Sequence, residues 1–204
     1  MNPVVFEKNH LSIVYDADRI TDPHARLLDY IYWQEQEAIR DSLSGRGNTY
    51  RVEAPFGTCM LRKMLRGGLP GRIIEDRYLF MGKERSRAFR EFHLLNRLRE
   101  ADLPVPAPLA ALCNRLGFSY QAALMTEALE NVVTLADLVG ERNTESSWAK
   151  CGACIRRFHE AGLDHADLNA RNILFRPEST EVFLNCTWPR TSLFQQPVAG
   201  RYRM

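Results

Sequence analysis

Residues 165–175 read HADLNARNILF, and this stretch decides how the rest of the chain is interpreted. His165 precedes Asp167 by two positions, and Asn172 follows Asp167 by five, directly before the apolar residues 173–175, which are typical of a buried strand. A carboxylate can orient a hydroxyl group and accept its proton, and an amide oxygen is a hard ligand of the kind that Mg²⁺ prefers. The spacing therefore predicts a catalytic loop, and the structural alternative is an Asx-rich turn between a helix and a strand.

Length and charge narrow the class of protein. The 204 residues are 45% apolar, enough to bury a core either as one domain or as two small lobes around a cleft. A formal net charge of +2 is too close to neutral to indicate nucleic-acid binding. Neither an apolar stretch of about 18 residues nor a cationic leader is present, so we expect the chain to be neither exported nor membrane-spanning.

Cysteine usage indicates a reducing compartment. Five cysteines, an odd number, argue against a disulfide framework and fit the cytoplasm. Cys151 and Cys154 form a C-x-x-C motif that is compatible with redox chemistry or half of a zinc site. Cys151 falls at helical spacing with Trp148, Ile155 and Phe158. The sequence therefore favours a role for the cysteines in the packed apolar face of a helix over a redox or zinc-binding role.

The first part of the chain is expected to hold an extension and a glycine-bearing hairpin. Residues 1–40 predict a strand at 11–16 and a helix at 25–40. Two β-rich runs then flank a Pro-Phe-Gly turn within 44–64, preceded by Gly45 and Gly47. Glycines without a Cβ let the backbone approach a bulky anion such as a phosphate, although an ordinary hairpin turn is the simpler interpretation of this pair alone.

The next predicted element is a helix over residues 84–101 that carries an inward acid. Ala88, Leu95 and Leu98 form its apolar stripe, and Glu91 falls inside the same stripe. A carboxylate there is costly unless a cation meets it, and the preceding strand offers two, Arg62 and Lys63. The alternative is a glutamate at the margin of a solvated face.

The order of the elements is more specific than any one of them. Three prolines in 103–111 end the helix, and residues 119–131 predict a strand that runs into a connector. Two helices at 134–139 and 146–163 then precede the opening motif. A phosphate cradle, a cation held by a carboxylate, a base and a metal ligand therefore occur in sequence. These are the parts that phosphoryl transfer needs.

The chain resembles the 3-deoxy-D-manno-octulosonic acid (Kdo) kinase family of Gram-negative bacteria, over residues 40–176. The resemblance is carried by GRGNTY (45–50), LRKMLRGGLPGRI (61–73), DRYLFMGKERSRAFREFHLLNRL (76–98), LPVPAPLAA (103–111) and HADLNARNILF (165–175). It implies an α+β, two-lobed protein-kinase-like fold whose large lobe looks truncated. The expected parts are an extension at 1–40, a small lobe at 41–127 and a partial large lobe at 128–204.

The resemblance also implies an activity, its cofactors and the residues involved. The expected reaction is ATP-dependent phosphorylation of a Kdo hydroxyl on Kdo-lipid A during lipopolysaccharide biosynthesis, with Mg²⁺ as the metal. Arg62 stands where protein kinases carry a lysine, and Lys63 lies beside it, so either could contact ATP. The implied roles are catalytic base for Asp167, loop support for His165, metal ligand for Asn172, phosphate cover for Gly45 and Gly47, and cation partner for Glu91.

Charge is concentrated in one segment. Residues 61–90 hold nine Lys and Arg against three acids, a local net charge of +6 that leaves −4 for the rest of the chain. Each cation near an anionic membrane contributes about 1 kcal/mol. We therefore expect peripheral association with the cytoplasmic face of the inner membrane, where Kdo-lipid A is the acceptor, and no nucleic-acid partner. A solvated helix face is the alternative.

The resemblance stops after the strand that follows Asn172. The family places a metal-binding aspartate there, whereas this chain has Asn185 and Cys186 and no acid further on. A frameshifted or truncated reading frame would explain the unusual tail. Two functions from different classes follow: a Kdo kinase, impaired in this chain by the missing aspartate, or a catalytically inactive kinase-like protein that binds nucleotide or lipid. Another sugar or small-molecule kinase of the same fold is a further alternative.

Overall fold

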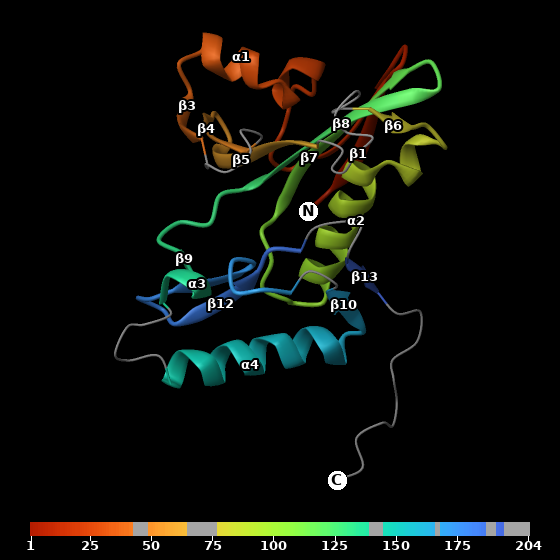
Figure 1. Cartoon of the computed structure of the whole chain (residues 1–204). Coiled ribbons are helices and arrows are strands. Elements are labelled where there is room, and N and C mark those ends of the chain that lie inside the picture. Colours follow the sequence, from red (N-terminus) through yellow and green to blue (C-terminus); the bar gives the residue numbers. More distant parts are fainter. Residues whose placement is uncertain (43–48, 65–76, 139–144, 166–167, 187–190, 194–204) are drawn as a thin grey trace. The chain divides into compact units, whose positions relative to one another are not determined.

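The computed structural model describes residues 1–42, 49–64, 77–138, 145–165, 168–186 and 191–193 (Figure 1). Two compact units make up the chain, one formed by residues 1–96 and 107–128 and the other by 97–106 and 129–204. Helices and antiparallel strands are both present, which confirms the predicted α+β class. Among the described residues, every helix is too short or too polar to span a bilayer.

An antiparallel sheet forms the centre of the first unit. Its strands lie in the order β1 (Pro3–Lys8), β2 (Leu11–Asp16), β7 (Pro108–Leu116), β8 (Ser119–Glu127), β5 (Gly57–Met64), β4 (Thr49–Ala54) and β3 (Ile39–Ser42), and β6 (Tyr78–Leu79) pairs with β8 beside this path. The predicted strand at 11–16 and the predicted hairpin around the Pro-Phe-Gly turn are confirmed as β2 and as β4–β5. Residues 1–16 add two strands to this sheet, next to β7.

The helix predicted at 25–40 is wrong in length. A 3-10 turn, η1 (Ala25–Leu28), is followed by the short helix α1 (Tyr30–Glu35), and then by strand β3. Asp29 separates the two with an extended backbone, and its carboxylate accepts a hydrogen bond from the Ile31 N–H at 3.1 Å. The aspartate acts as an N-cap, so the helical periodicity on its two sides belongs to two separate elements.

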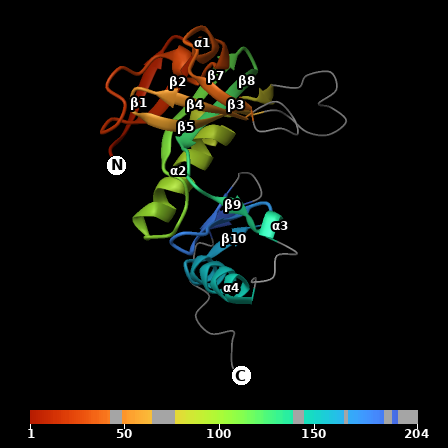
Figure 2. The same cartoon turned by 90° about the vertical axis from the view of Figure 1, so that its left-hand side faces the viewer.

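Both faces of the sheet are covered. On one face, η1 and α1 pack over an apolar core made of Ile13, Ile20, Leu27, Leu28, Trp33, Val52, Cys59, Leu61, Leu109, Ala110, Ala123 and Met125. Helix α2 (Arg87–Glu100), preceded by the 3-10 turn η3 (Lys83–Arg85), lies on the opposite side (Figure 2). The predicted stripe of α2 is confirmed, because Ala88, Leu95 and Leu98 are all buried.

The second unit holds two small sheets and two helices. Strands β12 (Glu181–Leu184), β11 (Ile173–Arg176) and β9 (Val133–Thr134) form one sheet in that order, and β10 (Leu163–His165) pairs with β13 (Thr191–Leu193). Helix α3 (Leu135–Leu138) follows β9, and helix α4 (Glu145–Glu160) packs on β10 and β12. The predicted buried strand at 173–175 and the helices at 134–139 and 146–163 are present with small shifts in their bounds.

Helix α4 supports the packing interpretation of the C-x-x-C motif. Cys151, Cys154 and Phe158 are buried, and burial raises the pKa of the Cys154 thiol to about 11. All five cysteines are free and buried, and no cluster of potential metal ligands occurs among the described residues. Trp148 is 48% exposed, so its predicted place in the packed stripe is wrong. Gly162 follows the helix with φ of +80°, as expected of a helix stop.

Candidate functional site

The basic residue of β5 that meets the inward glutamate is Arg62. Side chains alternate along a strand, so Cys59 and Leu61 face the core under α1 while Arg62 projects to the α2 side. There the guanidinium of Arg62 forms an ion pair and a hydrogen bond with the carboxylate of Glu91. The Glu91 side chain is 3% exposed and that of Arg62 is 29% exposed. The pair therefore has one buried partner and one that reaches solvent.

Lys63 is separated from this pair by the same alternation. It is the next residue of β5, lies on the other face of the strand, and is exposed. The structure thus brings Arg62, but not Lys63, to Glu91. Of the two cations that the sequence offered for this place, Arg62 is the one that contacts Glu91.

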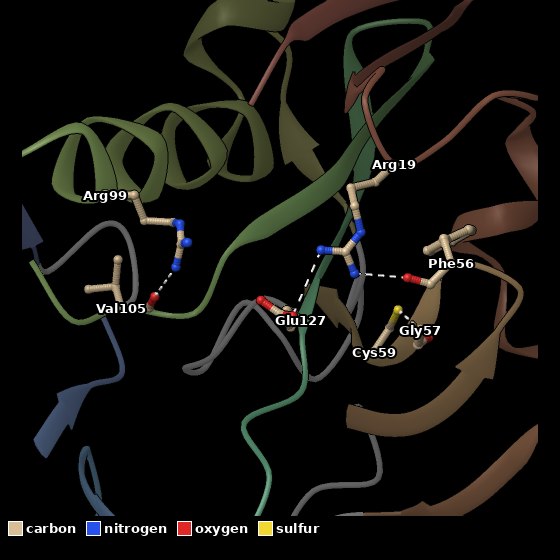
Figure 3. A network of polar contacts seen from close by, with 7 residues as sticks. All are labelled: Arg19, Phe56, Gly57, Cys59, Arg99, Val105 and Glu127. Carbon is tan, nitrogen blue, oxygen red and sulfur yellow. Dashed lines mark hydrogen bonds and ion pairs between the residues drawn. The ribbon is translucent and has the colours of Figure 1, made fainter. Parts of the chain in front are cut away.

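Arg19 anchors the start of β5 (Figure 3). Its Nη2 donates a hydrogen bond to the Phe56 carbonyl at 2.8 Å, and its Nη1 lies 3.8 Å from a carboxylate oxygen of Glu127 at the end of β8. At the same turn, the Cys59 thiol donates to the Gly57 carbonyl at 3.1 Å, and burial raises the pKa of this thiol to about 12. The β4–β5 turn is held against β8, which fixes the register of the strand that carries Arg62.

Local hydrogen bonds connect the described residues between β10 and β11, which are residues 168–172. The Leu168 N–H donates to the His165 carbonyl at 3.1 Å, and the Asn172 N–H donates to the Asn169 carbonyl at 2.9 Å. The side chain of Asn169 accepts a bond from the Arg171 N–H at 3.0 Å, which is an Asx turn. The turn predicted as the structural alternative is therefore present in the loop itself, and it sets Asn172 directly before β11.

His165 ties this loop to the segment after β12. Its Nε2 lies 3.1 Å from the carbonyl oxygen of Asn185, and since a carbonyl only accepts, Nε2 carries the proton. The Asn185 N–H in turn donates to the Asn172 carbonyl at 2.9 Å. His165 is buried, and its Nδ1 has no hydrogen-bond partner among the described residues. These contacts link His165 to Asn185, and the loop-supporting role of His165 stays a prediction.

The predicted metal position comprises Asn172 and residue 186, both of which the structure describes. Asn172 contributes an amide oxygen, which is a hard ligand, while Cys186 is buried at 1% exposure and offers a soft thiol. Three other predicted site residues, Gly45, Gly47 and Asp167, lie outside the described residues.

Two contributors were missed by sequence reasoning. Arg19 is a single arginine in a turn, and nothing in the residues around it marks it as an anchor. Asn185 acts through its backbone N–H and carbonyl, so its residue type carries no signal. Only the three-dimensional arrangement identifies main-chain contacts of this kind.

Comparison with known proteins agrees with the geometry of these elements. The sequence model described as "Lipopolysaccharide kinase (Kdo/WaaP) family" matches residues 31–186. The chain belongs to this family. The matched range contains every candidate site residue named above except Arg19, and it ends at Cys186.

Curated relatives and a solved structure extend this result. The chain is 45% identical over 164 residues to a 3-deoxy-D-manno-octulosonic acid kinase of Stenotrophomonas maltophilia, and 46% identical to one of Xanthomonas euvesicatoria pv. vesicatoria. Each match covers 80% of this chain and 66% of the relative, just under two thirds of its length. The Rio2 kinase of Chaetomium thermophilum, solved with ADP and Mg²⁺ as a phosphoaspartate complex, matches 84% of this chain and 54% of its own, with a TM-score of 0.50 and 17% identity. That likeness supports the kinase-like fold.

Proposed function

We propose that this family member is a phosphotransferase that uses ATP to phosphorylate a Kdo hydroxyl on Kdo-lipid A, in the synthesis of the lipopolysaccharide inner core. The observation that carries the proposal is the 45–46% identity to proteins named Kdo kinases, together with a family match that spans the residues expected to act on ATP and the sugar. The paired Arg62 and Glu91 are an independent support, since phosphoryl transfer needs a positioned cation for the phosphates.

Each candidate residue has a definite role in this proposal. Arg62, held in direction by Glu91, neutralises phosphate oxygens of ATP, and Lys63 is the second cation available on the same strand. Asp167 accepts the proton of the sugar hydroxyl as that oxygen attacks the γ-phosphorus, and ADP leaves. His165 keeps the loop in place through Asn185. Gly45 and Gly47 cover the phosphates with backbone N–H groups.

The described residues do not form a ligand set that fits Mg²⁺. When bound, Mg²⁺ neutralises the charge of the phosphates, and it prefers several hard oxygen ligands. Here Asn172 supplies one neutral oxygen, and a buried thiol stands at 186, where the family resemblance implies an aspartate. We therefore expect slow turnover in this chain.

This mismatch favours a second candidate function. A kinase-like protein with Arg62 and Glu91 intact but a weak metal position would bind nucleotide without rapid transfer. Cys186→Asp separates the two candidates, because it supplies the hard ligand while Asn185 keeps its main-chain hydrogen bonds. If the missing carboxylate limits turnover, this substitution raises turnover by orders of magnitude. It should also make the thermal midpoint of unfolding depend on Mg²⁺, a dependence that we do not expect in the wild type.

The acceptor also implies a location. The charge of +6 over residues 61–90 supports peripheral binding at the cytoplasmic face of the inner membrane, although 65–76 lie outside the described residues. Arg66 and Arg72, within that stretch, are the first positions for charge reversal, which should weaken binding to anionic vesicles and reduce its dependence on salt.

The deciding experiment measures phosphate transfer from ATP to detergent-dispersed Kdo-lipid A, alongside ATP binding by calorimetry. Wild type and Cys186→Asp are compared with Asp167→Asn in both backgrounds. We expect Asp167→Asn to abolish transfer and leave ATP binding nearly unchanged, because the carboxylate acts on the acceptor in the transition state. Near-normal transfer by this variant would exclude Asp167 as the base. ATP binding without transfer by both the wild type and Cys186→Asp would support the inactive binding protein.

A further inference from the structure

Three apolar side chains project from one end of the sheet in the first unit. Phe118, Leu79 and Met81 are 89%, 71% and 61% exposed, the highest values for large apolar side chains among the described residues. They are far apart in sequence but close in the fold, because β6 pairs with the start of β8: Leu79 is opposite Ser119, and the Phe80 N–H donates to the Phe118 carbonyl at 2.9 Å. We call these three residues the apolar tip.

Phe118 occupies a place that normally takes a polar residue. Strands β7 and β8 are joined by the two residues Gly117 and Phe118, with Leu116 paired to Ser119. Gly117 has φ of +64°, so the turn uses the conformational freedom of glycine at its first position. The second position has no such requirement and points into solvent, where Asn, Asp, Ser or Gly is usual. The turn geometry therefore gives no structural reason for a phenylalanine at 118.

The strands below the tip are rigidly supported. Tyr78 stacks on Tyr120 with ring centroids 5.3 Å apart, and the Tyr78 hydroxyl accepts a hydrogen bond from Arg87 at 2.7 Å. The Arg115 guanidinium lies 4.9 Å from the centre of the Phe80 ring, and it also donates to the Gly117 carbonyl at 3.0 Å. The aromatic residues on this side of β6 are thus used in packing, while Leu79, Met81 and Phe118 remain exposed. The tip is presented by a fixed scaffold.

Basic residues outnumber acidic ones in the segments at this end of the sheet. The β1–β2 turn lies at the same end of the sheet, since the Arg115 N–H donates to the His10 carbonyl at 2.8 Å, and strands β7 and β8 lie between β2 and β6. Residues 7–10, 77–86 and 115–119 contain five cations, Lys8, Arg77, Lys83, Arg85 and Arg115, and two acids, Glu7 and Glu84, which gives a net charge of +3. Glu7 is already paired, because Lys83 contacts its carboxylate at 2.7 Å. An apolar centre with a cationic rim complements an anionic lipid surface.

We propose that the apolar tip inserts into the headgroup and upper acyl region of an anionic phospholipid bilayer, with Arg77, Arg85 and Arg115 against the lipid phosphates. The inference rests on the peripheral membrane association within the proposed function and names the surface that makes it. Each apolar side chain moved out of water gains roughly tenfold or more in partitioning, and each cation about fivefold. Three short insertions are enough for reversible binding and do not span the membrane.

Insertion is tested with a tryptophan at the tip. Phe118→Trp is made together with Trp148→Phe and Trp188→Phe, which leaves only the buried Trp33 as background. The probe is a vesicle of equal parts phosphatidylglycerol and phosphatidylcholine, with or without bromine on the acyl chains. We expect the emission of the introduced tryptophan to shift to the blue and to be quenched by the brominated lipid. Ile31→Trp, on the exposed side of α1, is the matched control and should show neither effect.

Partitioning gives the second measurement. Phe118→Ser with Leu79→Ser should lower vesicle binding by at least about tenfold, whereas Ile31→Ser should change it less than about twofold. Because all of these side chains are exposed, the variants should keep the circular dichroism and thermal midpoint of the parent. Part of the binding should persist at high salt, since apolar insertion is not screened. No ATP or Kdo-lipid A is present, so failure of the proposed kinase activity cannot produce these results.

Two outcomes would overturn the inference. The first is that the Phe118→Trp variant binds the vesicles but its tryptophan emission is neither shifted nor quenched. That result would mean that another surface of the protein binds the membrane. The second is a dimer in sedimentation velocity that Phe118→Ser dissociates while vesicle binding stays unchanged. In that case the tip is a contact between two copies of the chain.

Discussion

Arg62→Met tests whether the ion pair with Glu91 behaves as a buried or as a surface interaction. Exposed ion pairs contribute about 0–1 kcal/mol, whereas removal of one partner from a buried pair costs about 3–5 kcal/mol. Glu91 is 3% exposed and Arg62 is 29% exposed, so solvent reaches only one side of the pair. We expect Arg62→Met to lower the free energy of unfolding of the first unit by about 3 kcal/mol, the lower end of the buried range.

The measurement is urea unfolding followed by the fluorescence of Trp33, with Trp148 and Trp188 replaced by phenylalanine. Trp33 is buried in the first unit, and its indole N–H donates to the Leu27 carbonyl at 2.7 Å, so its emission reports the loss of that core. Lys63→Met is the matched control, since Lys63 is exposed on the other face of the same strand and its loss should change stability by no more than an exposed interaction contributes, less than about 1 kcal/mol.

A double variant separates charge burial from packing. When Arg62→Met is combined with Glu91→Leu, the remaining contact is apolar, and most of the lost stability should return. The reasoning fails if Arg62→Met costs less than about 1 kcal/mol, or if the double variant is as unstable as Arg62→Met alone. Either result would mean that Glu91 reaches water or another cation easily when Arg62 is absent.

Three further predictions concern the scaffold of the first unit. The Cys59 thiol, with its pKa raised to about 12 by burial, should react with Ellman's reagent far more slowly in the folded than in the unfolded protein. The stabilising contribution of the protonated thiol is complete below pH of about 9 and is lost as the pH rises toward 12, and urea unfolding across that range would detect the loss. Gly57→Ala and Gly82→Ala should each lower the free energy of unfolding by about 1–2 kcal/mol, because φ is +119° at Gly57 and +102° at Gly82. Gly57→Ala should have the larger effect, since its Cβ would lie 3.3 Å from Arg19, and equal midpoints of unfolding would contradict this. Asp29→Ala should cost about 1 kcal/mol through loss of the α1 cap, with Asp29→Asn close to wild type in the same assay.

The elements best predicted from sequence are those with a clear periodicity. β2, the β4–β5 hairpin, α2 and β11 each show an apolar repeat that matches their observed burial. The same reasoning placed Glu91 among buried residues, and only a few residues could partner it. The alternation of side chains along the strand decides which cation contacts Glu91. The faces of the strand had to be known before Arg62 could be preferred to Lys63.

Elements defined by long-range pairing were harder to predict. β6 has two residues and exists because Tyr78 and Leu79 pair with Tyr120 and Ser119, which belong to a strand far along the chain. The helix expected at 25–40 was overextended because an aspartate within an amphipathic run looks the same whether it caps a helix or lies on its polar face. Arg19 has no local signal at all, since its acceptor is the carbonyl of Phe56.

The described contacts around β11 show that the main chain at Asn185 is held independently of the side chain at 186. Asn185 is held on both sides through its main chain, by His165 Nε2 at its carbonyl and by the Asn172 carbonyl at its N–H. Neither bond depends on which side chain follows at 186, so an aspartate or a cysteine there is compatible with the same backbone. The geometry of the loop and its capacity to bind a metal are therefore determined by different atoms. A fold comparison reports the first, whereas the second, in the function proposed above, depends on the side chains of Asn172 and of the buried Cys186.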